Sequence, residues 1–144
     1  MPATTTRRFF SRETRVSVDI ATTADRVWRL LTDATAIPRW NSTVVSITGE
    51  IKPAGRIALI STLDPKRTFK LTVKVFEPGR RLVWGDAMGR RTYEIMPRAG
   101  GGVTVTMHEK IGGPVFPLFA HMIPSFDASF DQFAADLKRA AEAP

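Results

Sequence analysis

Residues 116–139, FPLFAHMIPSFDASFDQFAADLKR, carry the clearest structural pattern in this chain. Their apolar side chains recur at steps of three or four residues, which is the spacing of one face of an α-helix. Polar side chains such as Ser129, Asp136 and Lys138 fall on the opposite face. The pattern therefore predicts a long amphipathic helix lying across a hydrophobic surface. Its apolar face consists of Phe116, Phe119, Ala120, Ile123, Phe126, Phe130, Phe133, Ala134 and Leu137.

Two prolines interrupt this predicted helix. Pro117 suits a first helical turn, where a missing backbone N–H costs nothing. Pro124 would remove a hydrogen bond from a continuous helix, so two geometries are open. Either the helix kinks near His121, or a new helix starts at Pro124.

The residues before this helix predict strands. Residues 14–20 alternate strictly between apolar and polar side chains, as a half-buried strand does. Two short helices follow, and residues 44–110 then read as six strands separated by turns rich in glycine and proline. Strands joined by short turns pair antiparallel. We therefore predict an α+β fold with a seven-stranded antiparallel sheet. Residues 1–13 form a flexible arm in this prediction, and residues 14–144 form one ligand-binding domain.

Composition narrows the class of protein. The chain has 144 residues, of which 43% are hydrophobic and 24% charged, as expected for one globular domain. It contains no apolar run of ~18 residues that would span a membrane. Its polar, arginine-rich N-terminus lacks the apolar core of a signal peptide, so we expect a cytoplasmic protein. The absence of cysteine excludes disulfides and thiolate nucleophiles.

The net charge of +7 raises the question of a nucleic-acid partner. The basic residues are scattered as arginine pairs near turns, such as Arg7-Arg8 and Arg90-Arg91, and form no basic helix. We therefore expect a solvated basic surface and no nucleic-acid partner. Only two histidines are present, on different predicted elements, so we expect neither a metal site nor a cofactor.

The segments ADRVWRLLTD (residues 24–33) and IPRWN (residues 37–41) resemble the START-like, or SRPBCC, superfamily. Glu109 followed by Gly112-Gly113-Pro114 before the last helix agrees with it. The resemblance covers residues 14–141. That superfamily includes polyketide cyclase/dehydrase-like proteins, lipid-transfer START domains and the birch-pollen allergen family. The resemblance implies a helix-grip fold, in which the seven-stranded sheet curves around the C-terminal helix. Two short helices close one end, and the cavity between sheet and helix takes apolar or amphipathic molecules.

Strand parity selects the candidate catalytic residues. Period two places Glu109 on the same face as Val105 and Met107, which should be the concave one. Glu109 would then be a general acid or base at the cavity mouth, or a strand-end carboxylate paired with an arginine. Tyr93 would point inward, and its buried hydroxyl would need a ligand or Glu109 as a hydrogen-bond partner. His121, near Pro124, is the third candidate.

The predicted ligand-binding residues lie on the concave strand faces, on the last helix and at the cavity rim. Asn41 follows Trp40 at that rim, where its amide could donate to a ligand. The full set is Asn41, Phe69, Leu71, Val73, Trp84, Tyr93, Ile95, Val105, Met107, Phe119, Ile123 and Phe126.

Three functions fit these residues. The first is a carrier or sensor that binds an apolar or aromatic small molecule in the cavity. The second is an enzyme of the polyketide aromatase/cyclase type that uses the cavity carboxylate. The third is a protein-binding module of the Hsp90-activator-like type, which would need an exposed patch. The pattern leaves open whether the chain is an enzyme, and it leaves the oligomeric state open.

Overall fold

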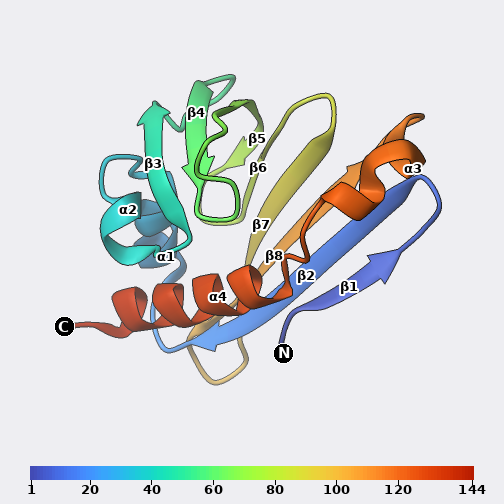
Figure 1. Cartoon of the computed structure of the whole chain (residues 1–144). Coiled ribbons are helices and arrows are strands. Elements are labelled where there is room, and N and C mark those ends of the chain that lie inside the picture. Colours follow the sequence, from blue (N-terminus) through green and yellow to red (C-terminus); the bar gives the residue numbers. More distant parts are fainter.

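One antiparallel sheet of eight strands forms the body of the protein in this computed structural model of residues 1–144 (Figure 1). The strands are β1 (Thr4–Arg7), β2 (Ser11–Ile20), β3 (Val44–Gly49), β4 (Arg56–Ser61), β5 (Phe69–Glu77), β6 (Arg81–Gly85), β7 (Gly89–Pro97) and β8 (Val103–Gly112). Their order across the sheet is β1-β2-β8-β7-β6-β5-β4-β3. The α+β prediction is confirmed.

The predicted strand number of seven is wrong, because β1 adds an eighth strand. It lies in the segment predicted to be an arm and pairs with β2 from Thr4 opposite Arg15 to Arg7 opposite Arg12. A solvated edge strand buries no face, so its sequence carries no alternation of apolar and polar residues. The strand β2 also starts earlier than predicted, at Ser11.

The helices lie outside the run of strands. They are α1 (Ala24–Thr32), α2 (Ile37–Trp40), α3 (Phe116–Phe119), the 3₁₀ turn η1 (Ala120–Met122) and α4 (Asp127–Glu142). The chain is extended at Ile123, and α4 begins three residues after Pro124. Of the two geometries left open, the fresh start is therefore the one adopted. Figure 1 shows α4 running across the sheet beside β2, with α1 and α2 at one end.

The core lies between α4 and the facing side of the sheet. Phe130, Phe133 and Leu137 on α4 are at most 3% exposed. They meet inward side chains of β7 and β8, including Ile95 and Val105, in one cluster of 25 buried residues. Strand parity predicted these faces correctly, because a side chain two positions along a strand returns to the same face.

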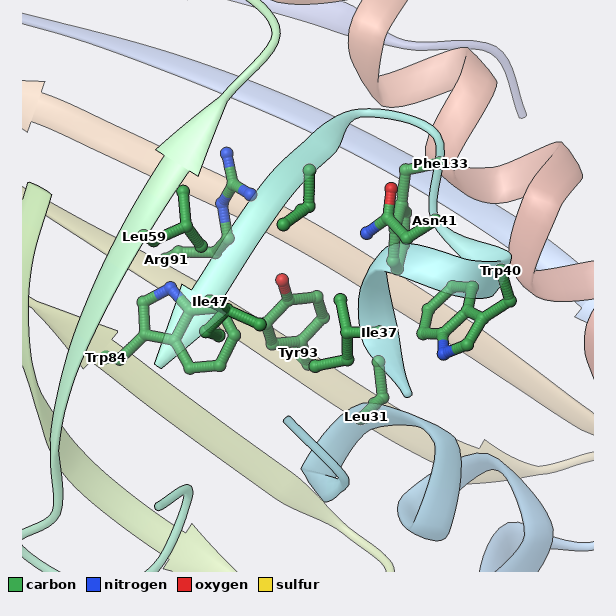
Figure 2. A pocket seen from close by; sticks show the side chains of 11 residues that line it. Leu31, Ile37, Trp40, Asn41, Ile47, Leu59, Trp84, Arg91, Tyr93 and Phe133 are labelled. Carbon is green, nitrogen blue, oxygen red and sulfur yellow. The ribbon is translucent and has the colours of Figure 1, made fainter. Parts of the chain in front are cut away.

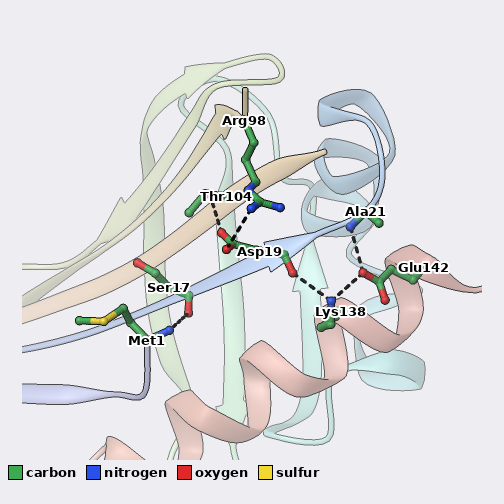
Figure 3. Close-up of polar contacts among 8 residues, drawn as sticks. All are labelled: Met1, Ser17, Asp19, Ala21, Arg98, Thr104, Lys138 and Glu142. Atoms are coloured by element: carbon green, nitrogen blue, oxygen red, sulfur yellow. Dashed lines mark hydrogen bonds and ion pairs between the residues drawn. The ribbon is translucent and has the colours of Figure 1, made fainter. Parts of the chain in front are cut away.

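Polar contacts tie the C-terminal end of α4 to the end of β2 (Figure 3). Lys138 donates from Nζ to the carbonyl of Asp19 at 3.0 Å, and Glu142 accepts from the backbone N–H of Ala21 at 2.9 Å. Lys138 and Glu142 also pair with each other at 2.7 Å. These contacts hold the C-terminal end of α4 against the end of β2.

One polar residue of α4 lies in the interior. The helical pattern placed Asp136 on the solvated face, but its side chain is only 1% exposed. It accepts hydrogen bonds from the backbone N–H of Ser42 at 2.8 Å and from the Ser42 hydroxyl at 2.7 Å. Asp136 therefore fastens the segment between α2 and β3 to α4.

Candidate functional site

A groove with a volume of about 250 Å³ opens between the sheet and the segment that joins α3 to α4. The β4–β5 loop, the β6–β7 turn and the end of β8 form its other sides. Its apolar lining comes from Val44, Leu59, Leu63, Phe69, Leu71, Trp84, Met88, Ile111, Phe119, Met122, Ile123 and Phe126. Its charged lining comes from Asp64, Arg67, Asp86, Arg90, Arg91 and Glu109.

A much smaller void of about 10 Å³ lies further inside, between α2 and the strands β3, β6 and β7. It has room for about one water molecule. Figure 2 shows Leu31, Ile37 and Tyr93 converging on it, with Arg91 and Trp84 on one side. Arg91 and Trp84 line both spaces, so they mark the inner end of the groove.

The charged pair at this inner end joins β7 to β8. Arg91 and Glu109 are direct cross-strand partners, and Arg91 donates from Nε to Oε1 of Glu109 at 2.6 Å. Both side chains are about one-fifth exposed, at 20% and 17%. Burial alone lowers the pKa of Arg91, but the attraction of Glu109 outweighs it and holds that pKa above its ordinary value. Arg91 stays positively charged at the groove floor.

Tyr93 lies next to this pair, one inward position further along β7. It is 4% exposed and contacts the Trp84 ring edge-on at a centroid distance of 5.3 Å. In Figure 2 its hydroxyl points to the side where Arg91 lies. Burial raises the pKa of the Tyr93 phenol, and the Arg91 guanidinium partly opposes that rise. The phenol is therefore neutral at neutral pH and able to donate or accept a hydrogen bond.

A second arginine, Arg12, also shapes the groove, although it is not one of the predicted site residues. Arg12 on β2 is 3% exposed. It donates to the carbonyls of Ile123 and Pro124 at 3.1 and 2.8 Å, and its guanidinium lies 4.9 Å from the Phe126 ring centroid. These bonds hold the extended segment before α4 as one wall of the groove. Burial, together with the charge of Arg7, lowers the pKa of Arg12.

The predicted site residues fall into four places. Phe69, Leu71, Trp84, Glu109, Phe119, Ile123 and Phe126 line the groove. Asn41, Tyr93 and Trp84 line the inner void. Val73, Ile95, Val105 and Met107 are buried in the core and line neither space. His121 is exposed and lines neither space, so the structure does not bring it together with Glu109 and Tyr93.

Asn41 has a structural contact of its own. Its side-chain oxygen accepts from the backbone N–H and from the hydroxyl of Thr43, at 3.0 and 2.6 Å. Only the amide nitrogen is left for another partner. These hydrogen bonds stabilise the turn before β3. In the ligand-binding role predicted for it, Asn41 could act only as a donor, through its amide nitrogen.

Sequence reasoning missed Arg91 and Arg12. Arg91 was grouped with the surface arginine pairs, although it shares its strand face with Tyr93 and Ile95. That parity was the signal that would have found it. Arg12 lay in the predicted arm, and nothing in the sequence indicates that its partners are two backbone carbonyls more than a hundred positions away.

Comparison with known proteins supplies the family. A large antiparallel sheet packed against a C-terminal helix is the arrangement of a helix-grip fold. Residues 11–142 match the family described as "Polyketide cyclase / dehydrase and lipid transport". The chain belongs to this family, which confirms the resemblance to the SRPBCC superfamily. A comparison with curated proteins found no match.

Solved structures share the fold at low sequence identity. A conserved protein of unknown function from Enterococcus faecalis is 15% identical, with a TM-score of 0.71 over 99% of this chain and 78% of that one. The di-domain aromatase/cyclase BexL from the BE-7585A biosynthetic pathway is 14% identical, with a TM-score of 0.73 over 96% of this chain and 52% of that one. A START superfamily protein from Mycobacterium smegmatis is 14% identical, with a TM-score of 0.65 over 90% of this chain and 97% of that one.

Two further observations concern the whole chain. None of its helices combines the length and apolar character that a membrane span requires. His, Asp and Glu side chains form no group of three that could hold a metal ion.

Proposed function

We propose that this protein binds a small, largely apolar molecule with one hydrogen-bond acceptor, and acts as its carrier or sensor. The observation that carries this proposal is the composition of the groove. Apolar walls end at a half-buried, positively charged arginine, and ligand sites commonly combine an apolar lining with a few placed polar groups.

The volume limits the size of the molecule. A cavity of about 150 Å³ holds benzene, and drug-sized pockets start at roughly 300 Å³. A groove of about 250 Å³ therefore suits a molecule with one or two rings. A sterol would require the segment around Ile123 to move, and the Arg12 hydrogen bonds oppose that movement.

The polar end of the ligand would meet Arg91. Glu109 engages only Nε of this guanidinium, so the terminal nitrogen atoms stay available to the Tyr93 hydroxyl and to a ligand acceptor. A carboxylate, phenolate or ketone oxygen is the chemistry that such donors recognise.

The test uses two fluorescent dyes, the anionic anilinonaphthalenesulfonate and the neutral Nile red. We expect both to bind and to be displaced by one- and two-ring aromatic compounds. Ile123→Asp puts a carboxylate into the apolar wall and should weaken both dyes by ~10-fold or more, because an unpaired charge there loses its solvation. Met96→Asp, at a residue 60% exposed on the outside of β7, is the matched control and should leave both affinities unchanged. Equal effects of the two variants would contradict binding in the groove.

A paired substitution tests the role of Arg91. Changing Arg91→Met together with Glu109→Gln removes both charges and leaves no unpaired carboxylate behind. The anionic dye should bind ~10-fold more weakly, since a charge-assisted hydrogen bond contributes on the order of 1.5–3 kcal/mol. Nile red should bind within a few-fold of wild type. An equal loss for both dyes would mean that the arginine shapes the groove and does not recognise the acceptor.

The second candidate function is an aromatase/cyclase. The proximity of Glu109, Arg91 and Tyr93 favours this function. Closing a ring in a poly-β-ketone chain requires proton transfer to or from the substrate, and these side chains could take part in it. Glu109→Gln separates the two functions. In a carrier it should leave apolar ligand affinity within a few-fold. In a cyclase that uses this carboxylate it should reduce turnover of a linear poly-β-ketone by ~10²-fold with binding retained.

A further inference from the structure

Exposed apolar side chains gather at one end of the sheet. Ten large hydrophobic residues are exposed in this protein, and six belong to three neighbouring segments there. We call these six the apolar end patch: Phe9, Phe10, Met88, Val115, Leu118 and Met122. Phe9 and Leu118 are 73% and 77% exposed, values typical of polar residues. Solvated single apolar residues are ordinary, but six at one end form a patch of the kind that contacts a partner.

Backbone hydrogen bonds hold the three segments together. The N–H of Gly112 donates to the carbonyl of Met88 at 2.9 Å, and the N–H of Gly113 donates to the carbonyl of Phe10 at 3.1 Å. These glycines lead directly into Val115 and α3. Figure 1 accordingly shows α3 beside the turn between β1 and β2, at the end of the molecule away from the C-terminus.

The charges of the same segments are mostly positive. Residues 7–10, 85–90 and 110–122 contain Arg7, Arg8, Arg90 and Lys110, all exposed, and a single carboxylate, Asp86. The Asp86 carboxylate accepts hydrogen bonds from the backbone N–H groups of Met88 and Gly89 at 2.8 and 3.0 Å, within the turn between β6 and β7. The segments that carry the exposed apolar side chains therefore also carry an excess of positive charge.

Exposed apolar side chains next to positive charge favour a partner that is both apolar and negatively charged. A lipid bilayer with anionic headgroups offers an apolar interior next to negative charge, which complements both features of the patch. A second copy of the chain would bring the same four cations against each other across a twofold interface, and that repulsion opposes self-association.

We propose that the apolar end patch docks this protein on the surface of an anionic lipid bilayer. Leu118, Phe9 and Phe10 enter the headgroup region, and Arg7, Arg8, Arg90 and Lys110 contact the lipid phosphates. Met88 and Met122 belong both to the patch and to the lining of the groove. The mouth of the groove therefore faces the bilayer in the docked state. The docking itself does not depend on which molecule the groove binds.

Vesicle flotation tests the docking with the full chain. We expect the protein to float with vesicles of phosphatidylcholine mixed with phosphatidylglycerol, and to float much less with phosphatidylcholine alone. Raising the ionic strength should weaken the binding, because salt screens the contacts between arginines and headgroups. Failure to bind the anionic vesicles at low salt would overturn the proposal.

Variants separate docking from general attraction of a basic protein. Leu118→Gln, at a side chain with little to lose in the fold, should reduce the partition coefficient by ~5–10-fold because it removes an inserted apolar group. Arg7→Gln with Arg8→Gln should reduce it by ~10-fold or more. Met96→Gln and Lys74→Gln are controls for exposed residues outside the patch, and both should bind as wild type does.

Two further results would overturn the proposal. If Lys74→Gln reduced binding as much as the Arg7 and Arg8 changes, the attraction would be unspecific. If light scattering showed a dimer that Leu118→Gln dissociated, the patch would be an interface between copies. The double variant Arg91→Met, Glu109→Gln should float as wild type does, so failure of the groove proposal and failure of the docking proposal give different results.

Discussion

Replacing Phe130 with alanine should lower the free energy of unfolding by about 3–5 kcal/mol, the usual loss for a buried aromatic ring. Phe130 is 1% exposed on α4. Its ring stacks on Phe126 at a centroid distance of 6.0 Å, and the Arg91 guanidinium lies 5.3 Å from its centroid. The substitution removes the contact between α4 and the inner end of the groove and leaves a cavity, because the strands around it cannot close the gap.

Phe9→Ala is the matched control, because it makes the same chemical change at a ring that is 73% exposed. Urea unfolding followed by circular dichroism should show a change within about 0.5 kcal/mol for this variant. Similar losses for the two variants would mean that α4 is not held on the sheet through Phe130. A loss for Phe130→Ala below about 1 kcal/mol would contradict the fold itself.

Much of this fold was predictable because its strands have one buried face. Period two placed Tyr93, Ile95, Val105 and Met107 on the inner side, and all four are buried. The edge strand β1 has no such face, so its threonines and arginine gave no signal. Pro124 indicated an interruption before α4, but the choice between a kink and a restart depends on tertiary partners such as Arg12, which binds the extended carbonyls.

The site was less predictable than the fold. Strand parity placed Glu109 and Tyr93 on the same face of the sheet. Parity does not show which residues of that face line the groove and which lie in the core, because that depends on the elements packed against them. Val105 and Met107 follow the same parity as Glu109 but lie in the core, in one buried cluster with Phe130 of α4. Arg91 was missed because charged residues are usually exposed, and one that is only 20% exposed is recognised by its partner. Here the partner, Glu109, is eighteen positions away in the sequence.

Asp136 shows the limit of helical periodicity. A carboxylate on the polar side of an amphipathic helix is usually solvated. The periodicity of α4 carries no information about Ser42, so it could not show that Asp136 is covered. The segment after α2 crosses this side of α4 and covers Asp136 with hydrogen-bond donors. The position of that crossing depends on how the short helices sit on the sheet, which local sequence does not specify.

Asp136 is expected to make a large, pH-dependent contribution to stability. Its carboxylate accepts from the Ser42 N–H and hydroxyl, from Gln132 at 2.8 Å and from Arg139 at 2.9 Å. Asp136→Ala removes these acceptors and leaves the Ser42 N–H without its partner. Because hydrogen bonds to a charged group contribute about 1.5–3 kcal/mol, we expect the free energy of unfolding at neutral pH to fall by about 3 kcal/mol.

The pH dependence follows from the pKa of this carboxyl group. Burial alone raises the pKa of Asp136, but the hydrogen bonds from Ser42, Gln132 and Arg139 outweigh burial and hold it below its ordinary value. The folded state therefore binds the proton less readily than the unfolded chain, whose aspartates titrate near about 3.9. The stabilisation is fully present above that pH and is lost as the pH falls through the lower, folded pKa.

The measurement compares wild type and Asp136→Ala by urea unfolding at neutral pH and at successively lower pH. The difference in free energy of unfolding should stay constant down to about pH 5 and then shrink, since protonation of the carboxylate removes in wild type what the substitution removes in the variant. Asp64→Asn, in the exposed loop between β4 and β5, is the control and should leave the whole profile unchanged. A difference that stayed constant into acid would mean that Asp136 stabilises the fold by packing alone, and that its charge does not hold the segment around Ser42 on α4.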